Sequence, residues 1–164
     1  MPQASGLQFT ATIGEYSSDH FSVVGFALTE RLSELFQGRL DLASTDPSVV
    51  ASKVLEQPVD LVIWQDRAPL RRFTGVVSEF ARGDSGHRRT RYELVFRPPL
   101  WRLALMHNSR IFQNRGTDEI VRTLLEERGV VDTVFDLERR PEEREYCVQH
   151  RESDLAFVER LAAE

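Results

Sequence analysis

The chain has few of the residue types from which metal and catalytic sites are most often built. It contains one cysteine, Cys147, which excludes an internal disulfide framework. Its histidines form no HxxxH or HExxH pair; they are His20, His87, His107 and His150. We therefore expect no metal site and no cofactor.

Long apolar runs and an excess of positive charge are also missing. No stretch approaches the roughly 18 apolar residues that a membrane-spanning helix needs. Residues 1–6 carry neither a basic segment nor an apolar core, so we expect no Sec signal peptide, synthesis in the cytoplasm and no membrane anchoring. The formal net charge of −5 argues against a general nucleic-acid binder, and we expect no nucleic-acid partner.

Alternating hydrophobicity dominates the first hundred residues and predicts short strands. In the second of these, Val24, Phe26 and Leu28 are expected on one face, and a short helix is expected from an Asp46 N-cap to about Leu55. Strands so closely spaced favour a closed barrel or a sandwich, because closure removes exposed edges. The expected strands are 7–13, 21–29, 36–43, 59–64, 70–80 and 89–96.

The pair Pro98-Pro99 marks a boundary, after which helical patterns appear. Thr117 is expected to cap a helix that ends at Gly129, in the conformation typical of a C′ glycine. Residues 130–137 are expected to be extended, and residues 146–149 to form a strand. Ser153 is expected to cap a last amphipathic helix, which is still running at the final residue and suggests a fragment of a longer protein.

Residues 83–86 (GDSG) resemble the nucleophile loop of trypsin-like serine proteases. That chemistry also needs a histidine base and a buried aspartate around the serine, and nothing in the chain resembles the usual histidine loop. His87 also stands where those proteases carry a further glycine. The composition favours a hairpin turn, and a serine hydrolase using Ser85 is the least favoured function.

Cys147 and His150 lie three residues apart in the expected strand. Zinc would need further ligands, and the two side chains tend towards opposite faces. We therefore expect Cys147 to be a buried small hydrophobe and His150 a surface or interface residue.

Arginines bracket the expected hairpin of residues 70–96. They suit either a solvated strand face that protects a sheet edge or a charged rim that docks on a partner. The sequence leaves both alternatives open for this set, which comprises Arg71, Arg72, Arg88, Arg89, Arg91 and Arg97.

Five segments together form a recognisable series along the chain. They are 73–77 (FTGVV), 92–103 (YELVFRPPLWRL), 109–114 (SRIFQN), 144–149 (REYCVQ) and 152–161 (ESDLAFVERL). Taken in order, these segments resemble the VgrG family, the trimeric spike-tip proteins of type VI secretion machines. The similarity covers essentially the whole chain, although His150 stands where that family commonly has an aromatic residue.

The resemblance implies a β-rich α+β fold like that of a phage tail baseplate hub. Residues 1–103 would form the first tube-like β-barrel domain, and residues 104–164 the truncated start of a second, α+β hub domain. The implied function is structural and not enzymatic, with no catalytic, cofactor-binding or metal-binding residues: a hub that caps the Hcp tube hexamer and carries the puncturing needle.

The partners implied by the same resemblance are two further copies in a homotrimer, Hcp, and effector or baseplate proteins. The protein would be secreted by the type VI machinery without a signal peptide. The alternative is a tail hub or baseplate protein of a contractile phage or phage-like particle, since the two classes share one architecture.

Overall fold

The computed structural model describes residues 6–139 and 141–163, and the chain divides into two units, Met1–Pro98 and Pro99–Glu164. The division coincides with the Pro98-Pro99 pair that the sequence marks as a boundary. The domain division expected near residue 103 lies within the 3₁₀ helix η2 (Pro99–Leu105). Leu103 of η2 is fully buried in the core of the second unit, so by its packing η2 belongs with that unit.

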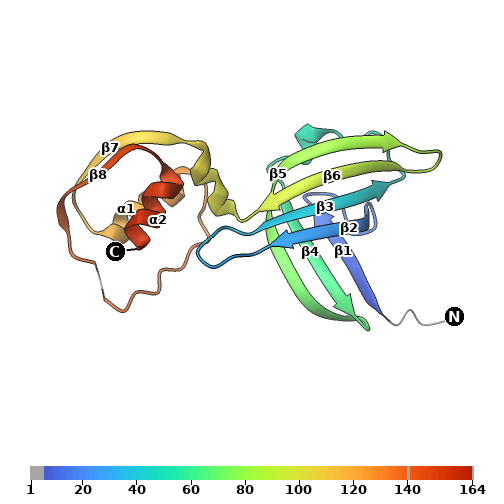
Figure 1. Cartoon of the computed structure of the whole chain (residues 1–164), viewed down its shortest axis with the longest axis horizontal. Helices are drawn as coiled ribbons and strands as arrows, with labels where there is room; N and C mark the ends of the chain where they lie inside the picture. The colour runs from blue at the N-terminus through green and yellow to red at the C-terminus, as the bar shows by residue number, and fades with distance from the viewer. Residues whose placement is uncertain (1–5, 140, 164) are drawn as a thin grey trace. The chain divides into compact units, whose positions relative to one another are not determined.

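Six antiparallel strands form one curled sheet in the first unit, in the order β1-β4-β5-β6-β3-β2 (Figure 1). The two edge strands approach each other through side chains: the rings of Phe9 in β1 and Phe26 in β2 lie 5.0 Å apart. The expected hub-like β-rich fold is confirmed, in the form of a curled half-barrel. The strands are β1 (Leu7–Ile13), β2 (Ser22–Thr29), β3 (Gln37–Ser44), β4 (Pro58–Gln65), β5 (Ala68–Ser85) and β6 (Thr90–Arg97).

The inner face of this sheet carries the apolar half of each alternating pattern. Tyr92, Leu94 and Phe96 of β6 are all buried, as the sequence predicts. The prediction for Val24 was wrong, because a β-bulge between Val23 and Gly25 shifts the alternation of β2. Val23 instead packs against the core, and Val24 is 54% exposed.

The helix expected from Asp46 to Leu55 was also wrong. The Asp46 carboxylate accepts hydrogen bonds from the backbone N–H and hydroxyl of Ser48, at 2.8 and 2.6 Å, as a helix cap would, but only a turn follows. Only Ala51–Lys53 forms a single 3₁₀ turn, η1. The following backbone pairs with β5: Val77 N–H donates to the Gln57 carbonyl at 2.9 Å.

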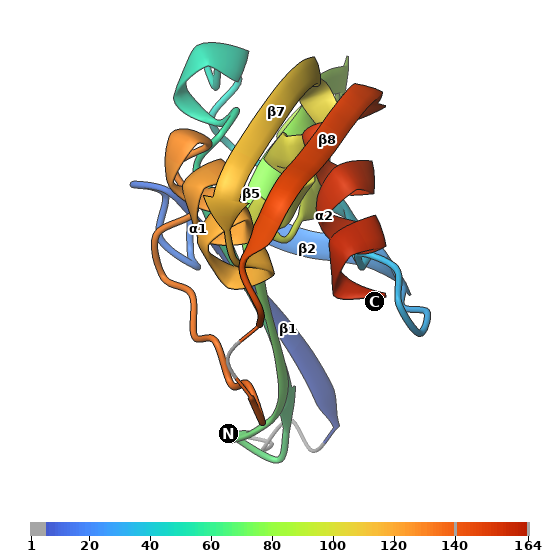
Figure 2. The ribbon, with the colours of Figure 1, turned by 90° about the vertical axis from the view of Figure 1, so that its left-hand side faces the viewer.

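The second unit places two helices against one face of a two-stranded antiparallel sheet (Figure 2). The strands are β7 (His107–Arg115) and β8 (Arg144–Ser153), and the helices are α1 (Thr117–Glu127) and α2 (Asp154–Ala162). Their shared core includes Phe112, Ile120, Leu124, Cys147, Phe157 and Leu161. Hydrophobic alternation does not reveal β7, because Phe112 is its one buried side chain.

Local signals predict the helix ends of this unit with one exception. Ser153 Oγ accepts the Ala156 N–H at 3.0 Å, which confirms the cap of α2. Gly129 follows α1 at φ +68°, and its N–H donates to the Glu126 carbonyl, as expected for a C′ glycine. The Thr117 cap was wrong: Gly116 is the N-cap and Thr117 is the first helical residue.

Candidate functional site

Ser85 lies at the end of β5, and not inside a catalytic arrangement. The turn to β6 follows it, closed by a hydrogen bond from Gly86 N–H to the Arg89 carbonyl at 2.8 Å. The exposed Ser85 hydroxyl lies 3.1 Å from Thr90 Oγ1 and accepts from Arg82 at 3.2 Å. Neither neighbour is a general base, so this geometry does not supply what serine hydrolysis requires.

We expect Ser85→Ala to change the free energy of unfolding by less than about 0.5 kcal/mol, because the side chain is exposed. Hydrolysis of a chromogenic ester should be at buffer level for both proteins. The matched control is Thr90→Ala, which removes the buried partner of the same contact and should destabilise more. An ester hydrolysis rate that falls with Ser85→Ala would restore the hydrolase hypothesis.

Cys147 and His150 lie on opposite faces of β8. Cys147 is buried against the helices, as predicted, and His150 is exposed. In the described part of the chain, no group of three or more His, Cys, Asp and Glu side chains is placed to hold a metal ion. The pair therefore has no shared ligand position.

The arginines of the expected rim fall into two groups, and the first group is neutralised within the unit. Arg72 forms a bidentate pair with Asp60 at 2.7 and 2.6 Å. Arg71 pairs with Glu30 at 2.7 Å, and Arg97 with Glu79 at 2.9 Å. Pairs of this kind at a surface contribute little stability, and they leave little free charge for a partner.

The second group lies near the turn between β5 and β6. Arg89 donates a hydrogen bond to Ser22 Oγ at 3.2 Å. Arg88 and Arg91 are exposed and, among residues 6–139 and 141–163, have no carboxylate partner. Among the six arginines of the expected rim, those without a carboxylate partner in the described residues therefore lie at this end of the hairpin. We call this group the arginine tip (Arg88, Arg89 and Arg91). This is the part of the rim that is free to meet an acidic partner.

The most elaborate polar cluster lies in the second unit, and sequence reasoning missed it. Asp154, fully buried, accepts four hydrogen bonds through its carboxylate. Oδ1 accepts from Asn108 and from Gln149, each at 2.8 Å. Oδ2 accepts from Nε and Nη2 of Arg128, at 2.9 and 2.7 Å. Arg110 approaches Oδ2 at 3.9 Å.

This cluster, the Asp154 network, joins both strands and both α-helices of the second unit. Asn108 comes from β7, Arg128 is the C-cap of α1, Gln149 comes from β8 and Asp154 begins α2. Burial raises the pKa of Asp154, but the hydrogen bonds from Gln149, Asn108 and Arg128 and the charge of Arg128 outweigh it and hold that pKa below its ordinary value. The network is a structural joint between the elements.

In the sequence, Asp154 has the pattern of an acidic residue in the first turn of a capped helix, which is usually solvated. Its partners are 5 to 46 positions away and belong to other elements. Only the Glu152-Ser153-Asp154-Leu155 part of the VgrG-like motif pointed to this place.

Comparison with protein families places the chain among tail hub proteins. The family described as phage tail baseplate hub (GPD) matches residues 29–164. A type VI secretion system spike protein VgrG2b of Pseudomonas aeruginosa is 44% identical over 96% of this chain. A spike protein VgrG3 of Vibrio cholerae is 38% identical over 96% of it. The chain spans only 15% and 16% of the length of these two curated relatives.

Solved structures agree with the sequence comparisons. The Escherichia coli c3393 protein, described as a type VI secretion component similar to the T4 tail proteins gp27 and gp5, aligns over 98% of this chain and 40% of its own, with a TM-score of 0.73 and 28% identity. A 43 kDa tail protein of prophage MuSo2 from Shewanella oneidensis aligns over 96% of this chain and 48% of its own, with a TM-score of 0.63 and 12% identity. The second likeness concerns the fold alone.

Proposed function

This chain belongs to the phage tail baseplate hub family, and from that premise we propose that it is the hub region of a type VI secretion spike protein. One observation carries the proposal: identity of 38–44% over 96% of the chain to proteins named as type VI spikes. The curled sheet followed by a small α+β unit, shared with the c3393 protein, supports it. The role of such a region is mechanical.

The partners we propose are two further copies of the longer protein, the hexameric Hcp tube, and effector or baseplate proteins. Each copy would contribute curled sheets to a ring that matches the six-fold tube end. The arginine tip is our candidate for a docking contact, because charges at an interface set register and selectivity more than affinity. No nucleic-acid partner is proposed.

We propose no catalytic role for these 164 residues. The support is the Ser85 geometry together with the relatives' names, which describe spikes. A relative called actin cross-linking toxin VgrG1, from Vibrio cholerae, is 42% identical over 79% of this chain, which spans 12% of that protein. The activity in its name would then belong to another part of that longer protein.

The route to the target cell is proposed to be the type VI machinery itself, after synthesis in the cytoplasm. Within the described residues, none of the helices has the length and hydrophobicity required to cross a bilayer. The relatives are components of a secretion machine, which supports export of the spike with the tube.

The full-length protein is expected to sit at the ends of Hcp tubes as a trimer. Negative-stain electron microscopy of purified tubes mixed with the protein would show capped ends, and we expect the variant Arg88→Glu/Arg91→Glu to reduce the capped fraction severalfold. Charge reversal at the exposed Arg139 of the second unit is the matched control and should leave capping unchanged. Tubes that remain bare with the unmodified protein would contradict the proposal.

The second candidate function is a hub of a contractile phage tail. The description of the matching family, phage tail baseplate hub, favours it, whereas the likeness to the MuSo2 tail protein, at 12% identity, concerns the fold alone. The two functions differ in the tube protein that the hub caps. Capping of a phage tail tube but not of an Hcp tube would favour the phage function.

A further inference from the structure

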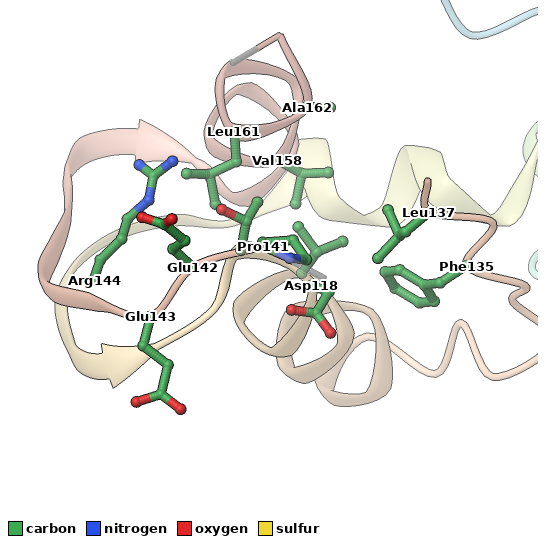
Figure 3. A pocket seen from close by; sticks show the side chains of 12 residues that line it. Asp118, Phe135, Leu137, Pro141, Glu142, Glu143, Arg144, Val158, Leu161 and Ala162 are labelled. Carbon is green, nitrogen blue, oxygen red and sulfur yellow. The ribbon is translucent and has the colours of Figure 1, made fainter. Parts of the chain in front are cut away.

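The second unit contains an apolar pocket that the proposed tube contacts do not use. Its volume is about 620 Å³, within the range usual for ligand sites. It lies between the start of α1, the loop before β8 and the last turns of α2 (Figure 3). Its apolar lining includes Val121, Phe135, Leu137, Val158 and Leu161.

The lining is partly fixed by the core and partly open to solvent. Val158 and Leu161 are 9% and 3% exposed because their other faces pack in the core of the unit. Leu137 is 48% exposed, and Phe135 is held by Arg122, whose guanidinium carbon lies 4.4 Å from the ring centroid. The floor of the pocket is therefore part of the packed core, whereas its mouth presents the exposed side chain of Leu137.

The charged residues that line the pocket are mainly acidic. Among the lining residues that the structure describes, Asp118, Glu142 and Glu143 contribute three carboxylates and Arg144 contributes one cation. Asp118 Oδ1 is buried and accepts no hydrogen bond within the described residues. Oδ1 faces the backbone of Gly116, so the acidic character that a ligand would meet comes mainly from the exposed Glu142 and Glu143.

We propose that this pocket is a docking site for an extended peptide segment of a partner protein, in which an apolar side chain stands next to a lysine or arginine. The apolar side chain would enter between Val121 and Leu161, and the cation would lie at the acidic rim. An apolar pocket beside an excess of carboxylates favours peptides that carry an apolar side chain next to a cation, and it disfavours acidic peptides. The site lies on the second unit, so it goes beyond the tube-capping function and is tested separately from it.

The test uses the 164-residue chain, isotope-labelled at valine and leucine methyl groups, and two synthetic peptides that differ only in charge. One is Gly-Leu-Leu-Lys-Lys-Gly and the other Gly-Leu-Leu-Glu-Glu-Gly, both blocked at their ends. We expect saturable shifts of the Val121, Val158 and Leu161 methyl signals with the lysine peptide, and binding at least tenfold weaker for the glutamate peptide.

Two variants and one control separate the pocket from non-specific attraction. Ala162→Leu fills the pocket from an exposed position of α2 and should abolish the shifts, whereas Ala163→Leu, the exposed neighbour outside the lining, should not. Glu142→Lys/Glu143→Lys should weaken the lysine peptide at least tenfold. All three variants change exposed residues, so their folds can be verified by unchanged methyl signals from valines and leucines outside the pocket.

The proposal is overturned if the lysine peptide gives no saturable shifts, or if both peptides bind equally. It is also overturned if shifts survive Ala162→Leu, or if they follow self-association of the chain, detected by light scattering at the same concentrations. Each of these results is independent of whether the full-length protein caps tubes.

Discussion

Replacing Asp154 with alanine is expected to destabilise the second unit by about 3–5 kcal/mol, the usual cost of breaking a buried ion pair by removing one partner. The variant removes the carboxylate oxygen that accepts both hydrogen bonds from Arg128. It also removes the acceptor of the Asn108 amide and the shorter of the two hydrogen bonds from the Gln149 amide, which keeps the Glu152 carbonyl at 3.3 Å. Urea unfolding followed by circular dichroism and by the fluorescence of Trp101, which lies in η2, measures the loss.

The matched control for this prediction is Asp132→Ala. Asp132 is an exposed acid of the same unit, so its replacement should change stability by less than about 0.5 kcal/mol. The double variant Asp154→Ala/Arg128→Ala should lose less free energy of unfolding than the two single variants lose together, because the two side chains are coupled. Additive effects would show that Asp154 acts independently of Arg128.

The same network predicts the direction of a pH dependence. The folded-state pKa of Asp154 is lowered below the ordinary value of an aspartate, so the stability that its ionised form contributes is fully present above the unfolded-state pKa. It is lost as pH falls through the lower, folded-state pKa. The gap in stability between the unmodified protein and Asp154→Ala should therefore be constant at neutral pH and shrink below about pH 4.

Replacing Gly38 with alanine is expected to destabilise the first unit by about 2–3 kcal/mol, through overpacking of a full core. Gly38 in β3 lies directly opposite Phe96 in β6. A Cβ at Gly38 would overlap Cε1 of the fully buried Phe96 ring. The ring cannot simply turn away, because its other side lies close to Gly75 in β5. A Cβ placed on Gly75 would lie 3.1 Å from Cδ2 of the same ring.

A reduced side chain at position 96 isolates the cause. Phe96→Leu alone should destabilise the first unit, because the smaller side chain leaves a cavity. In the Gly38→Ala background the same substitution should destabilise the unit much less, or restore its stability, because the alanine methyl at position 38 occupies that cavity. Gly83→Ala in β5 is the control: its Cβ would meet Arg91 at an ordinary 3.4 Å, so little change is expected. Equal costs of Gly38→Ala with phenylalanine and with leucine at position 96 would exclude the steric account.

Predictions that depend on a few adjacent residues were confirmed. The inward faces of Tyr92, Leu94 and Phe96 follow from alternation, and the caps at Ser153 and Gly129 follow from bonds to backbone groups three residues away. The predictions failed at the Asp46 turn, where a capping bond is not followed by a helix, at the bulge after Val23, and at Gly116, which takes the place of Thr117 as the cap.

The candidate site could be predicted only in part. The sequence places Arg88 and Arg91 near a hairpin turn. It cannot show that the other arginines are neutralised, because their acidic partners are distant in the chain. These partners lie 41, 12 and 18 residues from Arg71, Arg72 and Arg97. Ser85 matches a nucleophile motif in its local sequence only. Catalysis also requires a base and an acid that distant segments bring to the serine, which a local motif cannot show.

The sequence by itself determined the β-rich character of the first hundred residues, the boundary at Pro98-Pro99, the buried state of Cys147 and the resemblance to spike proteins. Only the tertiary structure decided that Asp154 is buried among four donors, that Phe96 closes over Gly38 and Gly75, and that an acidic-rimmed pocket forms beside α2. The physical reason is the range of the interactions. Hydrophobic periods and caps involve neighbours along the chain, whereas buried charge pairs, close backbone approaches and pockets depend on which distant elements meet.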